Sequence, residues 1–161
     1  MPDSLIYLDY NATTPIDPAV AEAMLPFLHQ HFGNPSSSHA YGVTARQAIE
    51  TARGQLAALL GCRPEEVLFT SGGSESNNTV IKGVAASRRD RGRHIITSAI
   101  EHPAVIEPCQ ALEAEGYEVT YLPVDASGRV DPGDVARAIR PGTILVTVMP
   151  VSYTHLRAHE T

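Results

Sequence analysis

The amino-acid sequence predicts an α/β fold: a mostly parallel sheet with flanking helices, preceded by an N-terminal arm and helices. From residue 66 onward, short runs rich in aliphatic and β-branched residues alternate with stretches of helical length. Strand and helix alternate at the lengths of right-handed crossover units, which make neighbouring strands parallel. The 161 residues are 43% hydrophobic, which suits a sizeable core and argues against disorder.

The first 60 residues predict an extended arm followed by two helices. Asp17 before Pro18 combines a capping side chain with proline at the first helical position. Gly61 follows a stripe of apolar residues at helical spacing and suits the left-handed end of a helix. The expected elements are an arm or short strand at 5–8, helices at 18–31 and 41–60, and a polar loop at 33–38.

The remaining residues predict four strands separated by helices. The run TILVTVM at 143–149 is continuous and β-branched, as in a strand buried on both faces. Gly116 closes one of the helices, and Asp131 before a proline opens another. The expected strands lie at 66–70, 94–100, 118–124 and 143–149, and the expected helices at 74–88, 104–115 and 131–139.

Composition excludes several classes of function. The net charge is −6 and no basic block occurs, so nucleic acid and anionic membrane surfaces are disfavoured as partners. No apolar run reaches 18 residues, and the N-terminus lacks the pattern of a signal peptide. Cys62 and Cys109 lie far apart, which fits a reducing, cytoplasmic compartment and small buried hydrophobes.

The basic residues consist of 11 arginines and a single lysine, Lys82. Any reaction that needs an active-site lysine therefore has one candidate within these residues. Lys82 falls in the expected helix 74–88, where a solvated lysine is the more common interpretation.

The strongest local signal is the turn after the expected strand 66–70. It contains Gly72 and Gly73, and Ser74 then opens a helix, so free backbone N–H groups converge on one spot suited to a phosphate. An ordinary capped turn with Ser74 as N-cap explains the same residues. The Gly-Lys pair of a Walker loop, the dinucleotide fingerprint and the nucleophile elbow are all absent from the sequence.

A second signal, Glu101-His102-Pro103, follows the expected strand 94–100, at an end where parallel sheets bind ligands. His102 suits stacking on a ring or proton transfer, and a plain helix-entry histidine is the alternative. His155 and His159 have the spacing of a metal pair but no third ligand nearby, so no metal site is expected.

Four motifs together carry a resemblance to a known family. They are YLDYNATTP at 7–15, GNPSSSH at 33–39, FTSGGSESN at 69–77 and EHPAV at 101–105. Residues 5–149 resemble the N-terminal part of cysteine desulfurases of the NifS/IscS group. This group belongs to the class V aminotransferase superfamily and has the pyridoxal-phosphate-dependent fold type I.

The resemblance implies an activity and a set of site residues. Such enzymes remove sulfur from L-cysteine, giving L-alanine and an enzyme persulfide for iron–sulfur clusters, tRNA or cofactors. Gly73 and Ser74 match the pair that binds the phosphate of pyridoxal phosphate. His102 matches the histidine that stacks on the pyridine ring and assists proton transfer, and Asn11 and Ala12 lie in the segment lining the substrate side. The implied partners are a sulfur-acceptor or scaffold protein and, in the full-length parent, a second copy.

The sequence departs from the family pattern after Met149, where the Asn-Asn-Glu segment is missing. The Schiff-base lysine and the persulfide cysteine would fall beyond Thr161, so these residues alone are expected to be inactive. The expected organisation is an arm and helical segment at 1–60, a partial, truncated cofactor-binding domain at 61–150, and a non-native tail at 151–161. The tail resembles a translated sequencing adapter. Alternatives are a selenocysteine lyase, another class V aminotransferase, or a non-catalytic phosphate-binding module.

Overall fold

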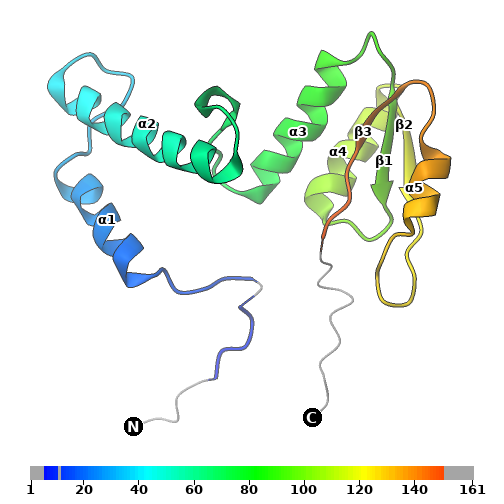
Figure 1. Cartoon of the computed structure of the whole chain (residues 1–161), viewed down its shortest axis with the longest axis horizontal. Coiled ribbons are helices and arrows are strands. Elements are labelled where there is room, and N and C mark those ends of the chain that lie inside the picture. Colours follow the sequence, from blue (N-terminus) through cyan, green and yellow to red (C-terminus); the bar gives the residue numbers. More distant parts are fainter. Residues whose placement is uncertain (1–5, 11, 151–161) are drawn as a thin grey trace. The chain divides into compact units, whose positions relative to one another are not determined.

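The computed structural model describes residues 6–10 and 12–150 (Figure 1). These residues form two compact units, with the division between Phe69 and Thr70. Helices and parallel strands together confirm the expected α/β class. Asn11 and the expected tail at 151–161 lie outside the described residues, and the three-part domain scheme stays a prediction. Within the described ranges, no helix combines the length and apolar character needed to span a bilayer.

The first unit contains helices α1 (Pro18–His29) and α2 (Ala40–Leu60). Asp17 caps α1 as expected, because its Oδ1 accepts the backbone N–H of Ala19 at 2.8 Å. The helix ends two residues before the expected position 31. Helix α2 ends as expected at Gly61, which has a φ of +66° that only glycine adopts without strain.

The loop between α1 and α2 packs closely against the first turn of α2. A Cβ on Gly42 would lie 2.4 Å from the carbonyl oxygen of Ser37 and 2.6 Å from that of Asn34. The Nδ1 of His39 accepts the N–H of Gly42 at 3.4 Å and caps the helix. The polar motif at 33–39 therefore has a packing role in this unit.

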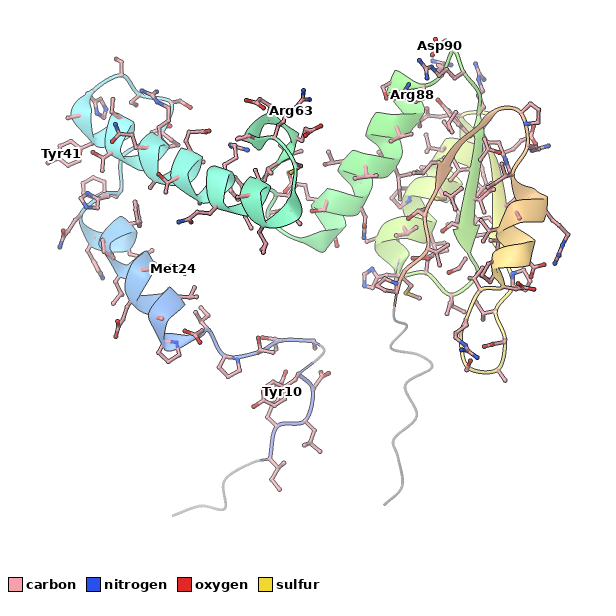
Figure 2. All side chains as sticks on the ribbon, in the orientation of Figure 1. Tyr10, Met24, Tyr41, Arg63, Arg88 and Asp90 are labelled. Atoms are coloured by element: carbon pink, nitrogen blue, oxygen red, sulfur yellow. The ribbon has the colours of Figure 1, made fainter. Side chains whose placement is uncertain are left out.

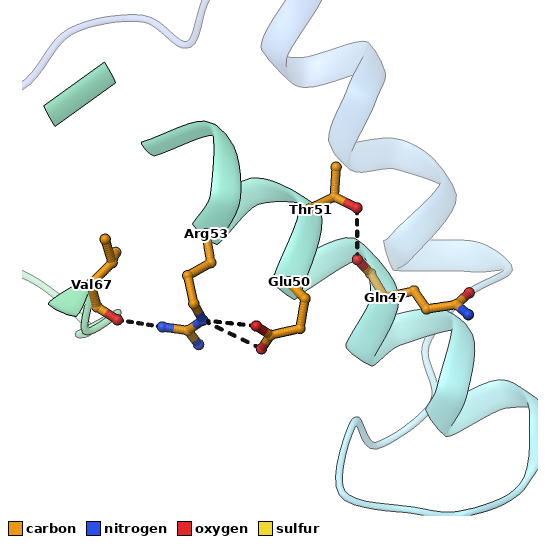
Figure 3. Close-up of polar contacts among 5 residues, drawn as sticks. All are labelled: Gln47, Glu50, Thr51, Arg53 and Val67. Carbon is orange, nitrogen blue, oxygen red and sulfur yellow. Dashed lines mark hydrogen bonds and ion pairs between the residues drawn. The ribbon is translucent and has the colours of Figure 1, made fainter. Parts of the chain in front are cut away.

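The expected strand at 66–70 is wrong. A short 3-10 helix, η1 (Pro64–Glu66), occupies the start of this segment, and residues 67–70 form no strand. Among the described residues, no strand lies beside this segment to pair with it. The carbonyl oxygen of Val67 instead accepts from the guanidinium of Arg53 on α2 (Figure 3).

The second unit contains a three-stranded parallel sheet in the order β2-β1-β3. Its strands are β1 (His94–Ser98), β2 (Glu118–Leu122) and β3 (Thr143–Val146). Every residue of the central strand β1 is buried, which fits its position between two neighbours. Each strand ends two or three residues before the expected end, where the chain turns into loops.

Helices α3 (Gly73–Ser87), α4 (Pro103–Ala114) and α5 (Pro132–Ala138) accompany this sheet. Figure 1 shows α4 and α5 on opposite sides of the strands, as right-handed crossovers in opposite directions require. Helices α3 and α4 pack on each other and share a core with β1. The core residues are Ile81, Ala85, Ile95, Val105, Cys109, Leu112 and Tyr117.

Candidate functional site

The N-termini of α3 and α4 face the same edge of the sheet, the edge where the strands end. Helix α4 follows β1, so it starts at this edge and runs back. Helix α3 precedes β1 through a short turn that contains Arg88 and Asp90 (Figure 2). Within that turn Gly92 packs directly on the backbone of Gly142, just before β3. Helix α3 therefore ends where the strands begin and starts where ligands bind in parallel sheets.

Helix α3 begins without a side-chain cap. Its N-cap is Gly72, and no side chain accepts from its first backbone N–H groups, whereas side chains cap α1, α2, α4 and α5. The helix starts at Gly73, so Ser74 lies in the first turn and is not the N-cap. A Cβ on Gly72 or Gly73 would meet no atom within 4 Å. The donors of the first turn are thus open to an approaching anion.

A carboxylate lies beside this open helix end. Glu75 Oε2 accepts the backbone N–H of Ser71 at 2.7 Å and the hydroxyl of Ser71 at 2.6 Å. The hydroxyl bond, and then the backbone bond, lower the pKa of Glu75 from its ordinary value. Thr70 and Ser76 join their hydroxyl oxygens at 2.6 Å across the same turn. These hydrogen bonds fix the shape of the turn. The negative charge of Glu75 repels an anion bound nearby.

His102 is the N-cap of α4 and carries a fixed ring. Its Nδ1 accepts the backbone N–H of Ala104 at 3.0 Å, with Pro103 at the first helical position. Because Nδ1 uses its lone pair in this bond, the neutral ring holds its proton on Nε2. The residue is exposed. The capping role and the chemical role expected from the sequence are therefore compatible. Nδ1 caps α4, while Nε2–H and one face of the ring remain available to a ligand.

The site residues fit the two parts of pyridoxal phosphate. The uncapped N–H groups at Gly73 and Ser74 suit a phosphate, and the ring of His102 suits an aromatic ring. The two groups lie at the N-termini of separate helices, α3 and α4. Among the described residues, no hydrogen bond joins Gly73 or Ser74 to His102. Asn11 lies outside the described residues, and Ala12 belongs to the first unit.

Sequence reasoning missed Glu101. Its side chain is buried, with 8% of the residue exposed. One carboxylate oxygen accepts the hydroxyl of Ser98 at 2.9 Å and the backbone N–H of Met149 at 2.7 Å. An acidic residue between a buried strand and a helix N-cap is the signal that could have identified it, since such a residue is rarely buried unless it is hydrogen-bonded.

The remaining candidates take no part in this edge of the sheet. Burial raises the pKa of the Cys109 thiol to about 11, so Cys109 is a buried hydrophobe as expected. Lys82 is exposed on α3. Residues 6–10 and 12–150 contain no group of three side chains able to hold a metal ion. The His155 and His159 pair lies outside them.

Comparison with known proteins gives consistent matches. The Aminotransferase class-V family model matches residues 6–155. The cysteine desulfurase IscS of Dictyoglomus turgidum is 56% identical over 144 residues, which are 89% of this chain and 36% of the relative. The cysteine desulfurase of Homo sapiens is 52% identical over 148 residues, 91% of this chain and 32% of the relative. The chain thus spans about a third of the length of these relatives.

Solved structures give the same picture. A NifS-like protein matches with a TM-score of 0.85 at 40% identity, over 91% of this chain and 40% of that chain. SspA in complex with cysteine matches with a TM-score of 0.84 at 45% identity, over 91% of this chain and 42% of that chain.

Proposed function

This chain belongs to the aminotransferase class-V family, and from that premise we propose that it carries the cofactor-binding portion of a cysteine desulfurase. The proposed reaction is the removal of sulfur from L-cysteine, giving L-alanine and a persulfide. The names of the relatives and the cysteine complex among the structural neighbours support this proposal. A sulfur-acceptor protein, assembly of the full-length parent as a homodimer, and a cytoplasmic location belong to the same proposal.

The observation that carries the proposal is the uncapped start of α3. Its free N–H groups and the hydroxyl of Ser74 would bind the phosphate of pyridoxal phosphate, with Gly73 leaving room for close approach. The ring of His102 would stack on the pyridine ring. Its Nε2–H would be free to donate a hydrogen bond, because Nδ1 already accepts the N–H of Ala104. When bound, pyridoxal phosphate supplies an electron sink for the carbon that loses its proton.

We further propose that these 161 residues do not catalyse the reaction by themselves. Their single lysine, Lys82, is exposed on α3, well past the first turn of the helix. The chain spans about a third of the length of its relatives. The family resemblance implies that the lysine anchoring the cofactor lies in the part that the chain does not span. Assays of alanine and sulfide release from L-cysteine, with added pyridoxal phosphate, test this directly.

Amide NMR of the full chain tests the binding site. Inorganic phosphate is expected to shift the amide signals of Gly73 and Ser74. Ser74→Ala is expected to weaken binding about tenfold, the effect of one hydrogen bond to a charged group. Ser87→Ala, at the far end of the same helix, is the matched control and should bind as the wild type does.

The same titration distinguishes a cofactor site from a simple phosphate-binding module. Pyridoxal phosphate is expected to shift the ring signals of His102 as well as the amides at the start of α3, whereas inorganic phosphate shifts only those amides. Equal responses to the two ligands would favour the non-catalytic module. Phosphate that leaves Gly73 and Ser74 unaffected would contradict the proposed site.

A further inference from the structure

The loop that carries His102 is anchored to both neighbours of β1. On one side, the backbone N–H of Ala99 donates to the carbonyl oxygen of Leu122 at the end of β2, at 2.9 Å. On the other side, the carboxylate of Glu101 accepts the N–H of Met149, just past β3, at 2.7 Å. The hydroxyl of Ser98 donates to the same carboxylate oxygen at 2.9 Å. The loop is thus joined to both neighbouring strands, through Ala99 and Glu101.

The carboxylate of Glu101 replaces a backbone acceptor in the hydrogen bonding between β1 and β3. The N–H of Thr147 still pairs with the carbonyl oxygen of Ile96 at 2.9 Å. In a parallel ladder the next donor, Met149 N–H, would reach the carbonyl oxygen of Ser98. It donates instead to Glu101, so the two strands separate at this point. A cavity of about 250 Å³, lined by Ser98 and Met149 among others, lies at this separation.

We propose that Glu101 is a positioning residue for His102. Acting through Met149 N–H and Ser98 Oγ–H, its carboxylate fixes the backbone that leads into His102 and therefore the ring of that N-cap. It also fixes the end of β3 against the same loop. The relevance to cofactor chemistry rests on the proposed function of His102, but the positioning is a property of the chain alone.

The test is histidine and amide NMR of the full chain without ligand. In the wild type, His102 is expected as the Nε2–H tautomer, and the Met149 amide is expected to exchange slowly with solvent. Glu101→Ala should mix the two tautomers of His102 and accelerate exchange at Met149 about tenfold or more, as expected for the loss of a charge-assisted hydrogen bond. Glu101→Gln keeps an acceptor oxygen and should retain the wild-type signals.

Glu107→Ala removes an exposed carboxylate from α4 and is the matched control, expected to change neither signal. A folded Glu101→Ala variant with wild-type signals at His102 and Met149 would overturn the proposal. If Glu101→Ala does not fold, Ser98→Ala decides: a smaller shift of the His102 tautomers in the same direction supports it, and unchanged signals overturn it. Phosphate titration at Gly73 and Ser74 tests the proposed function separately, so either idea can fail alone.

Discussion

The guanidinium carbon of Arg53 lies 4.9 Å from the centre of the Phe69 ring. The same side chain donates from Nη1 to the carbonyl oxygen of Val67 and from Nε to Glu50, at 3.2 Å and 3.3 Å from its two carboxylate oxygens (Figure 3). Arg53 therefore satisfies a carbonyl that a neighbouring strand would otherwise pair, and it holds the segment 67–69 against α2. A planar fork with several donors suits this task better than an ammonium group.

Replacing the guanidinium of Arg53 should destabilise the first unit. Arg53→Lys keeps the charge but loses the stacked guanidinium and one of the donors, so we expect the free energy of unfolding to fall by about 1–2 kcal/mol. Urea denaturation measures the change. Arg63→Lys is the matched control, because its exposed ion pair with Glu66 contributes little. Equal stabilities of the two variants would show that the contacts of Arg53 are dispensable.

Substitution by alanine is expected to have opposite effects at two glycines, one crowded and one with free space around it. A Cβ on Gly92 would lie 2.1 Å from the carbonyl oxygen of Gly142, so Gly92→Ala should destabilise the fold by about 1–3 kcal/mol. Gly54 lies inside α2, where an added Cβ would meet no atom within 4 Å. Gly54→Ala should therefore raise the free energy of unfolding by about 0.5–1 kcal/mol. Thermal unfolding of both variants checks the sign, and a neutral Gly92→Ala would contradict the tight turn.

Much of the fold follows from local patterns in the sequence. Asp17 and Gly61 mark real helix ends, and the run at 143–149 contains the real strand β3, because capping and apolar periodicity act within a few residues. The segment 66–70 shows the limit of such patterns. Its residues suit a strand, but a strand needs a neighbour, and here Arg53 takes the carbonyl oxygen of Val67.

The candidate site was predictable only in part. Gly73, Ser74 and His102 could be chosen from motifs, and they lie at the N-termini of α3 and α4. Their role in cofactor binding stays a prediction. Glu101 could not be assigned a role, because its partners Ser98 and Met149 are brought together by the sheet and Met149 is far away in sequence. The position of Glu101 between a buried strand and a helix N-cap suggests a buried, hydrogen-bonded carboxylate, but it does not show which groups the carboxylate bonds.

Lys82 is expected to be dispensable for phosphate binding. It is exposed on α3, on a turn beyond the open N–H groups at Gly73. Lys82→Ala should therefore bind inorganic phosphate as the wild type does, by the same amide titration. Treatment with pyridoxal phosphate and borohydride, followed by peptide mass spectrometry, should find no specific adduct at this residue. A stable adduct at Lys82 in good yield would contradict the proposal that the anchor lies elsewhere.

His94 makes the stability of the second unit depend on pH. Its Nδ1 lies 2.8 Å from the hydroxyl of Thr143 on β3, and its Nε2 lies 2.8 Å from the hydroxyl of Thr120 on β2. Burial, and then the charge of Arg140, lower the pKa of His94, while Glu118 acts in the opposite direction. The folded state therefore prefers the neutral ring.

The sign of the pH effect follows from this preference. The unfolded chain binds a proton at His94 near the ordinary histidine pKa of about 6.5, and the folded chain binds it only at lower pH. The stabilisation is complete above pH 6.5 and is lost as the pH falls from there toward the lowered pKa of the folded state. Urea denaturation between pH 7.5 and pH 5 should show this loss. His94→Gln should reduce the slope, whereas His29→Gln, on α1 in the other unit, should preserve it. A wild-type slope in the His94→Gln variant would assign the pH dependence to other groups.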